Sequence, residues 1–171
     1  MPLLKKIQKE YDKNIRPYIY HVNLADGRSF SFNFKKDNLK HLLGLQYIYD
    51  ETWFGGIIYQ KIKKGKITLK TIQSFPAYNG IEDRVLNFSR IKDLFETDKL
   101  IEFDPTKLKN CTLKTKFMFF NSTSGETLHL GIAEDGSYYP ETWFIRTQDK
   151  DKYIKNQTII NIDSIIKERK T

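Results

Sequence analysis

The hydrophobic pattern of this chain changes its period near residues 104–105, and this change limits the possible folds more than any other feature. Before it, apolar residues in segment 79–95 recur at the spacing of an amphipathic helix. After it, apolar and polar residues alternate in segments 113–120, 127–133 and 138–146, which predicts strands. Turn-forming residues separate these strands, so the pattern predicts a helical middle followed by an antiparallel meander.

The N-terminal part predicts one helix and a β-hairpin. Residues 3–15 carry apolar side chains at helical spacing. Residues 18–24 then alternate up to Asp26-Gly27, a dipeptide that strongly favours a hairpin turn. Segment 29–34 also alternates and puts its phenylalanines on one face, so we expect the second strand there.

Shorter elements complete the expected fold. Helices are predicted at 38–43, at 56–64 and after Thr68, and a further strand at 157–162. No Gly-, Pro- or Ser-rich linker divides the chain, so we expect one domain over residues 1–171. Its class would be α+β, with the hairpin and helices packed on a C-terminal antiparallel sheet of about four strands.

The charge is basic and unevenly distributed. Lysine and arginine number 29 against 21 aspartate and glutamate residues, a formal charge of +8. Segments 57–75 and 105–120 contain five and four lysines and no acidic residue. Such patches suit a phosphate backbone, although a lysine-rich solvated surface is the alternative. The candidate RNA-binding residues are Lys61, Lys63, Lys66 and Lys114.

Several functional classes lack support in the sequence. Cys111 is the only cysteine, which excludes a disulfide or a thiolate metal cluster within the chain. The three histidines form no metal-binding pair, and no phosphate loop, dinucleotide fingerprint or serine-hydrolase elbow is present. We therefore expect neither a metal nor a cofactor. Without a signal peptide or an apolar run of about 18 residues, a soluble, cytoplasmic protein without membrane contact is expected.

The remaining polar residues can supply metal-free ribonuclease chemistry. Such an enzyme needs a base for the 2′-hydroxyl, a proton donor for the leaving oxygen and cations for the phosphate. His41 lies among leucines on the predicted helix 38–43, where a packed structural histidine is the alternative to a catalytic one.

Four segments together resemble a known family. They are Phe34–Leu45, Ile62–Thr68, Ile81–Phe88 and Tyr138–Phe144. In this order they are similar to the phage barnase–EndoU–colicin–RelE-like nuclease family 4, over about residues 30–166. The resemblance implies helices packed on an antiparallel sheet whose open face binds RNA. It also implies metal-independent cleavage that leaves a 2′,3′-cyclic phosphate.

The resemblance points to His41, Arg84, Tyr139 and Thr142 as catalytic residues. His41 would be the general acid or base, because an unperturbed imidazole titrates near neutrality. Arg84 would clamp the phosphate with its planar fork, and Tyr139 or Thr142 would bind a phosphate oxygen or the 2′-hydroxyl. Ordinary surface pairing of Arg84 and ordinary strand positions for the other two are the alternatives. Arg146, on the same side of its strand as Thr142, would add an RNA contact.

Two functional hypotheses follow. The first is an endoribonuclease of phage or toxin type that acts on cellular RNA. The second is a non-catalytic RNA- or protein-binding module on a degenerate nuclease scaffold, which would bind RNA in a salt-dependent way without turnover. A toxin of this class can have a protein or an RNA antitoxin as its partner, and no pattern in this chain identifies one.

Overall fold

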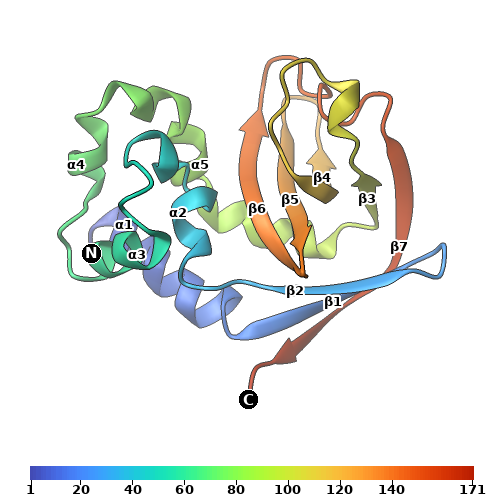
Figure 1. Ribbon diagram of the computed structural model, residues 1–171, viewed down its shortest axis with the longest axis horizontal. Helices are drawn as coiled ribbons and strands as arrows, with labels where there is room; N and C mark the ends of the chain where they lie inside the picture. The colour runs from blue at the N-terminus through green and yellow to red at the C-terminus, as the bar shows by residue number, and fades with distance from the viewer.

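The computed structural model describes residues 1–171 and shows a group of helices beside a β-barrel (Figure 1). The seven strands close the barrel in the order β1-β2-β6-β5-β4-β3-β7. Their bounds are β1 Tyr18–Leu24, β2 Ser29–Asn33, β3 Lys99–Glu102, β4 Thr115–Ser122, β5 Thr127–Asp135, β6 Ser137–Arg146 and β7 Thr158–Arg169.

The helical elements are short. The α-helices are α1 Leu3–Glu10, α2 Asn38–Leu42, α3 Gly55–Lys63, α4 Leu69–Gln73 and α5 Glu82–Leu86. A π-helical turn, η1 Tyr11–Ile15, extends α1, and the 3-10 segments are η2 Leu45–Tyr47, η3 Pro76–Gly80, η4 Phe88–Glu96 and η5 Pro105–Lys107. None of these helices is long and apolar enough to cross a membrane.

The predicted fold class, with a separate hairpin and an antiparallel sheet of about four strands, is wrong. The β1–β2 hairpin forms as predicted, but it belongs to the same closed sheet as the meander. Strand β7 pairs with both β1 and β3, and β2 meets β6 in parallel at Phe32 and Tyr138. Hydrophobic alternation predicts strands and their faces, but it does not predict which distant strands pair. The closure was therefore missed.

Two further elements differ from their predictions. The apolar stripe of segment 79–95 is buried as expected, yet it is split into η3, α5 and η4 rather than one helix. Asn87 leaves the helical conformation, with φ −110° and ψ 15°. Strand β7 continues to Arg169, beyond the predicted strand 157–162, so Ile165 and Ile166 belong to the strand rather than to a frayed tail. By contrast, Thr68 caps α4 as predicted, and its side chain accepts a hydrogen bond from the Thr71 amide.

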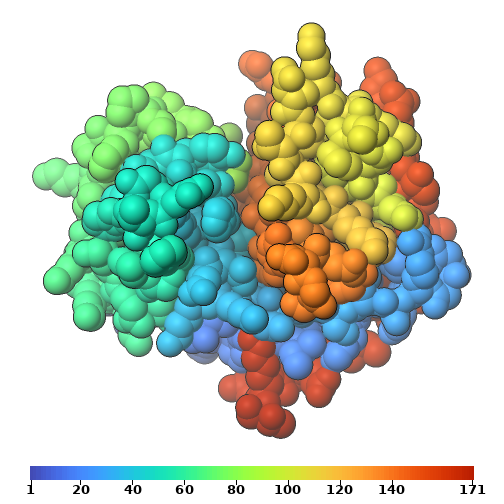
Figure 2. Space-filling model, viewed as in Figure 1, coloured from blue at the N-terminus to red at the C-terminus, as the bar shows by residue number.

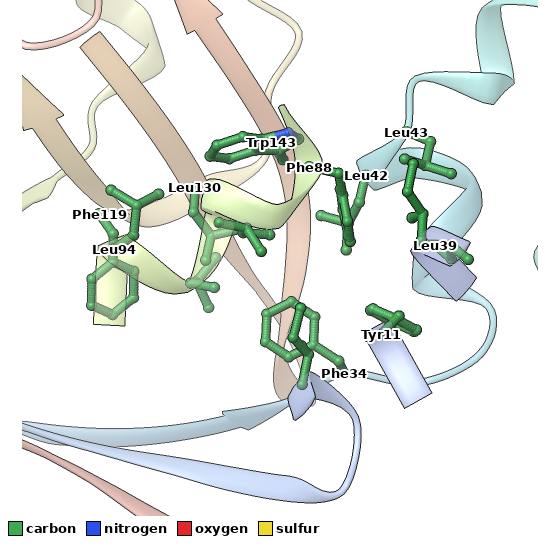
Figure 3. Close-up of a cluster of buried hydrophobic side chains, with 14 of the residues drawn as sticks. Tyr11, Phe34, Leu39, Leu42, Leu43, Phe88, Leu94, Phe119, Leu130 and Trp143 are labelled. Carbon is green, nitrogen blue, oxygen red and sulfur yellow. The ribbon is translucent and has the colours of Figure 1, made fainter. Parts of the chain in front are cut away.

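The main core joins the helices to the barrel (Figure 3). Phe34 from the hairpin segment, Leu39 and Leu42 from α2, and Trp143 from β6 are all fully buried in it. The Trp143 indole Nε1 donates a hydrogen bond to the backbone oxygen of Arg84, at 3.1 Å. This hydrogen bond links β6 to α5, and burial of the indole adds stability, since truncation of a buried tryptophan costs about 3–5 kcal/mol.

Candidate active site

Helix α2 packs along strand β6, and three of the four candidate catalytic residues lie on these two elements. His41 is on α2, and Tyr139 and Thr142 are on β6. Arg84 is on α5, which also contacts β6. Strand β6 is therefore the element that brings the four residues into one region of the molecule.

A pocket of about 300 Å³ lies between the helical part and the barrel, two parts that a hollow separates in Figure 2. We call it the arginine pocket. Arg84, Thr142 and Arg146 line it together with Tyr47 and Tyr153. The arrangement thus brings two cations and one hydroxyl group of the sequence-derived set to a single cavity, without His41 or Tyr139.

The Arg84 guanidinium group is largely enclosed by protein, and its Nη1 atom is buried without a hydrogen-bond partner. Its Cζ atom lies 5.6 Å from the centroid of the Tyr47 ring. Burial lowers the pKa of Arg84 from its usual value, and Tyr47 opposes this shift; a guanidinium group nevertheless stays charged at physiological pH. A buried cation without an anionic partner is unfavourable. A phosphate in the arginine pocket would supply that partner.

Arg146 provides the second cation. Its Nε donates a hydrogen bond to the backbone oxygen of Asp149 at 3.1 Å, and its Cζ lies 5.6 Å from the centroid of the Tyr153 ring. Each arginine of the pocket is therefore held against a tyrosine ring, which fixes a planar group suited to bidentate phosphate contact.

A β-bulge positions Thr142. Gly131 of β5 pairs with Thr142, but the next residue of β5 pairs with Pro140, so Glu141 is the extra residue of β6. The Glu141 carboxylate accepts hydrogen bonds from the Lys114 amide at 2.8 Å and from the Thr115 hydroxyl at 2.5 Å. A Cβ atom at Gly131 would lie only 2.9 Å from Cγ2 of Thr142, so the glycine permits this close packing.

His41 and Tyr139 line two neighbouring hollows. The hollow at His41 has a volume of about 610 Å³ and is also lined by Gln46. The one at Tyr139 has a volume of about 310 Å³ and is also lined by Asn38. The hollow at Tyr139 borders the α2–β6 interface, since residues of both elements line it. The two hollows and the arginine pocket share no lining residue.

Glu141 acts electrostatically on both residues. The pKa of His41 is lowered by burial and by Lys40, and the Glu141 carboxylate opposes this shift. The pKa of Tyr139 is raised by burial and further by Glu141. Glu141 was not among the residues chosen from the sequence, because nothing in the sequence marks it as the bulge residue. Tyr47, which contacts Arg84 from a separate element, was missed for a similar reason.

The candidate RNA-binding lysines occupy two regions. Lys61 and Lys66 line a shallow cavity of about 300 Å³ beside α3, and Lys63 is exposed outside it. Lys114 is exposed and follows Leu113, which lines the arginine pocket. No group of three or more His, Cys, Asp or Glu residues is arranged to hold a metal ion.

His129 of β5 is fully buried in the sheet. Its ring stacks on Phe144, with 4.2 Å between centroids. Burial lowers the pKa of His129 to about 3, so the ring is neutral at physiological pH. It serves as a packing residue.

Comparison with known proteins identifies one family. The family model described as phage-Barnase-EndoU-ColicinE5/D-RelE like nuclease4 matches residues 3–171. No curated protein and no solved structure matches the chain.

Proposed function

Because the chain belongs to this nuclease family, we propose that it is a metal-independent endoribonuclease that binds the scissile phosphate of RNA in the arginine pocket. The observation that carries the proposal is the buried Arg84 guanidinium group, whose Nη1 has no protein partner and which shares the pocket with Arg146 and Thr142. Fixed cations aimed at a phosphate stabilise the charge that develops in the transition state.

In the proposed reaction the 2′-oxygen of RNA bonds to phosphorus and the bond to the 5′-oxygen breaks. The products are a 2′,3′-cyclic phosphate and a 5′-hydroxyl end. Arg84 and Arg146 bind the non-bridging oxygens in this proposal, and the Thr142 hydroxyl donates a hydrogen bond to one of them. The guanidinium groups supply the positive charge that a metal ion supplies in other nucleases.

His41 exchanges the proton in this proposal, either from the 2′-hydroxyl or to the 5′-oxygen. The nearby Glu141 carboxylate stabilises the imidazolium form. Tyr139, whose pKa is raised, keeps its phenolic proton and so remains a hydrogen-bond donor. In this proposal the RNA contacts Tyr139 and His41 as well as the arginine pocket.

The test is cleavage of RNA by the purified protein in the presence of EDTA, with the new ends analysed by mass spectrometry. We expect fragments that end in 2′,3′-cyclic phosphate, and no cleavage of a strand whose 2′-hydroxyls are all methylated. Cleavage that requires a divalent cation would contradict the metal-independent mechanism. Binding of RNA without any cleavage would favour the non-catalytic module instead.

We further propose that, in the cell, the protein is a toxin of phage type that acts in the cytoplasm and is neutralised by an antitoxin. Induced expression should then arrest bacterial growth, and His41→Ala should relieve the arrest, since a general acid–base group contributes about 10²–10⁴-fold. Normal growth during strong expression of the active, unmodified protein would contradict the toxin role.

A further inference from the structure

Helix α3 has an outward face that the fold leaves uncovered. Ile58 and Ile62 face inward and are buried. On the opposite side, residues three or four positions apart form a row that we call the α3 stripe: Phe54, Ile57, Lys61 and Lys64. Phe54 is 69% exposed and Ile57 is 43% exposed. Two large apolar side chains next to lysines on one helix face indicate an interaction surface.

The positive charge of the stripe is not neutralised within the protein. Lys61, Lys64 and Lys66 line the shallow cavity beside α3, and none of them takes part in a salt bridge. The Lys61 ammonium group lies 4.9 Å from the centroid of the Trp53 ring. The surface therefore combines free cations with aromatic groups.

The stripe is held next to helix α2. Helices α2 and α3 pack together, and the buried Lys40 of α2 donates hydrogen bonds to the backbone oxygens of Asp50 and Trp53, at 3.0 and 2.7 Å. Phe54 also lines the hollow that contains His41. In Figure 1, α3 lies beside α2 on the side away from the barrel. A strand leaving His41 would therefore pass directly onto the stripe.

We propose that the α3 stripe binds a single-stranded stretch of the nucleic acid on one side of the cleaved phosphodiester. Phe54 and Ile57 contact bases, and Lys61, Lys64 and Lys66 contact phosphates. Exposed aromatic side chains stack on bases that are not paired, and neighbouring cations follow the backbone. This inference rests on the proposed function, because it takes the arginine pocket and His41 as the site of cleavage.

The test compares a dinucleotide with a single strand of about twelve nucleotides, long enough to leave the cleavage site and reach a stacking surface. The variants are Phe54→Ala and the double variant Lys61→Ala/Lys64→Ala. We expect KM for the long strand to rise about 10-fold, because removal of a stacking group weakens binding by about that factor or more. The kcat value and cleavage of the dinucleotide should not change.

Lys92→Ala is the control, since Lys92 is an exposed lysine on η4, outside the stripe and outside the candidate RNA-binding residues. Thermal unfolding of all variants checks that the fold is retained. An unchanged KM for the long strand in both stripe variants would overturn the inference, and so would an equal loss of dinucleotide cleavage in a folded variant.

A direct binding measurement separates this inference from the proposed function. Fluorescence anisotropy with a fully 2′-O-methylated strand needs no cleavage, so it reports on the stripe even if the protein proves to be no ribonuclease. We expect the stripe variants to bind more weakly. The slope of log affinity against log salt concentration should be shallower by about 0.7 for each phosphate that a variant no longer neutralises. Equal affinity of the variants and the unmodified protein, or equal binding of duplex and single strand, would overturn the inference.

Discussion

Arg84 combines two properties that oppose each other. Its guanidinium group is enclosed and lacks a partner for Nη1, which disfavours the folded state, yet in the proposed reaction the same group binds the phosphate. Methionine has an unbranched apolar side chain and carries no charge to bury. We therefore expect Arg84→Met to abolish detectable cleavage while raising the free energy of unfolding by about 1 kcal/mol.

Urea unfolding and single-turnover cleavage measure the two effects of Arg84→Met. Arg90→Met is the control, because Arg90 pairs with Glu126 outside the arginine pocket; it should retain full activity and gain no stability. A clear loss of stability in Arg84→Met would show that Arg84 is a structural residue rather than one kept for binding.

Glu141 should control the pH dependence of cleavage through His41. The pKa of His41 lies below its usual value, and the Glu141 carboxylate is the one group that raises it. The change Glu141→Gln removes a negative charge that stabilises the imidazolium form, so the pKa of His41 should fall further. The limb of the pH–rate profile that reports on His41 should then move to lower pH, whether His41 acts as base or acid.

The profile of kcat/KM against pH checks this shift, with Glu134→Gln as the control. Glu134 pairs with Lys116 and is not among the groups that act on His41. Movement of the limb to higher pH, or an identical shift in the control, would contradict the assigned coupling.

Among single residues, the sequence could suggest candidates that a resemblance marks, but it gave no signal for residues whose position only packing reveals. His41, Arg84 and Thr142 belong to recognisable segments, and two of them line the arginine pocket. Glu141 acquires its position from a register shift between β5 and β6, and Tyr47 from contact with a helix far along the chain. Neither property has a local sequence signal.

At the scale of elements, the bulge in β6 depends on a glycine in the neighbouring strand. A Cβ atom at Gly131 would meet the Thr115 hydroxyl and Cγ2 of Thr142 at distances too short for packing. Gly131→Ala should therefore destabilise the protein by about 1–3 kcal/mol, the usual cost of overpacking, and displace Thr142 from the arginine pocket. Activity should fall even at temperatures where the variant is fully folded.

Thermal unfolding and cleavage rates test Gly131→Ala. Gly125→Ala is a suitable control, because a Cβ atom at Gly125 would meet nothing within 4 Å. The double variant Gly131→Ala/Thr115→Ala should recover part of the lost stability, since it removes one of the two obstructing side chains. If Gly131→Ala were as stable and active as the unmodified protein, the close packing around the bulge would have no role in the site.

Elements with a strong local period were predicted well, and short or interrupted ones were not. The hairpin strands and the meander strands β4, β5 and β6 lie where the alternation of their sequences predicted strands. Strand β3 has only four residues, too few to establish a period. The apolar residues of segment 79–95 recur with the period of a helix. The periods of α-helices and 3-10 helices are so similar that a short, interrupted segment does not distinguish them.

At the scale of the whole molecule, the sequence indicated an open sheet and the chain forms a closed one. Closure depends on β7, which pairs with both β1 and β3. Strands β1 and β7 are separated by more than half of the sequence. Pairing between such distant segments is specified by packing of the complete core, where Phe32, Phe119 and Trp143 meet residues of the helices. No window of the sequence contains that information.

The closed sheet is not equally strong around its circumference. Strand β5 pairs with β4 over seven residue pairs and with β6 over nine, whereas β2 and β6 are joined in parallel by the single pair Phe32 and Tyr138. Local opening costs least where few backbone hydrogen bonds must break. We therefore expect native-state hydrogen exchange to be slowest for the amides of β5 and faster by orders of magnitude at the β2–β6 junction.

This junction borders the hollow of Tyr139, so opening there would widen one end of the α2–β6 interface without unfolding the arginine pocket. Equal protection of the two regions would mean that the barrel opens only by global unfolding, and RNA would then have to enter a rigid site.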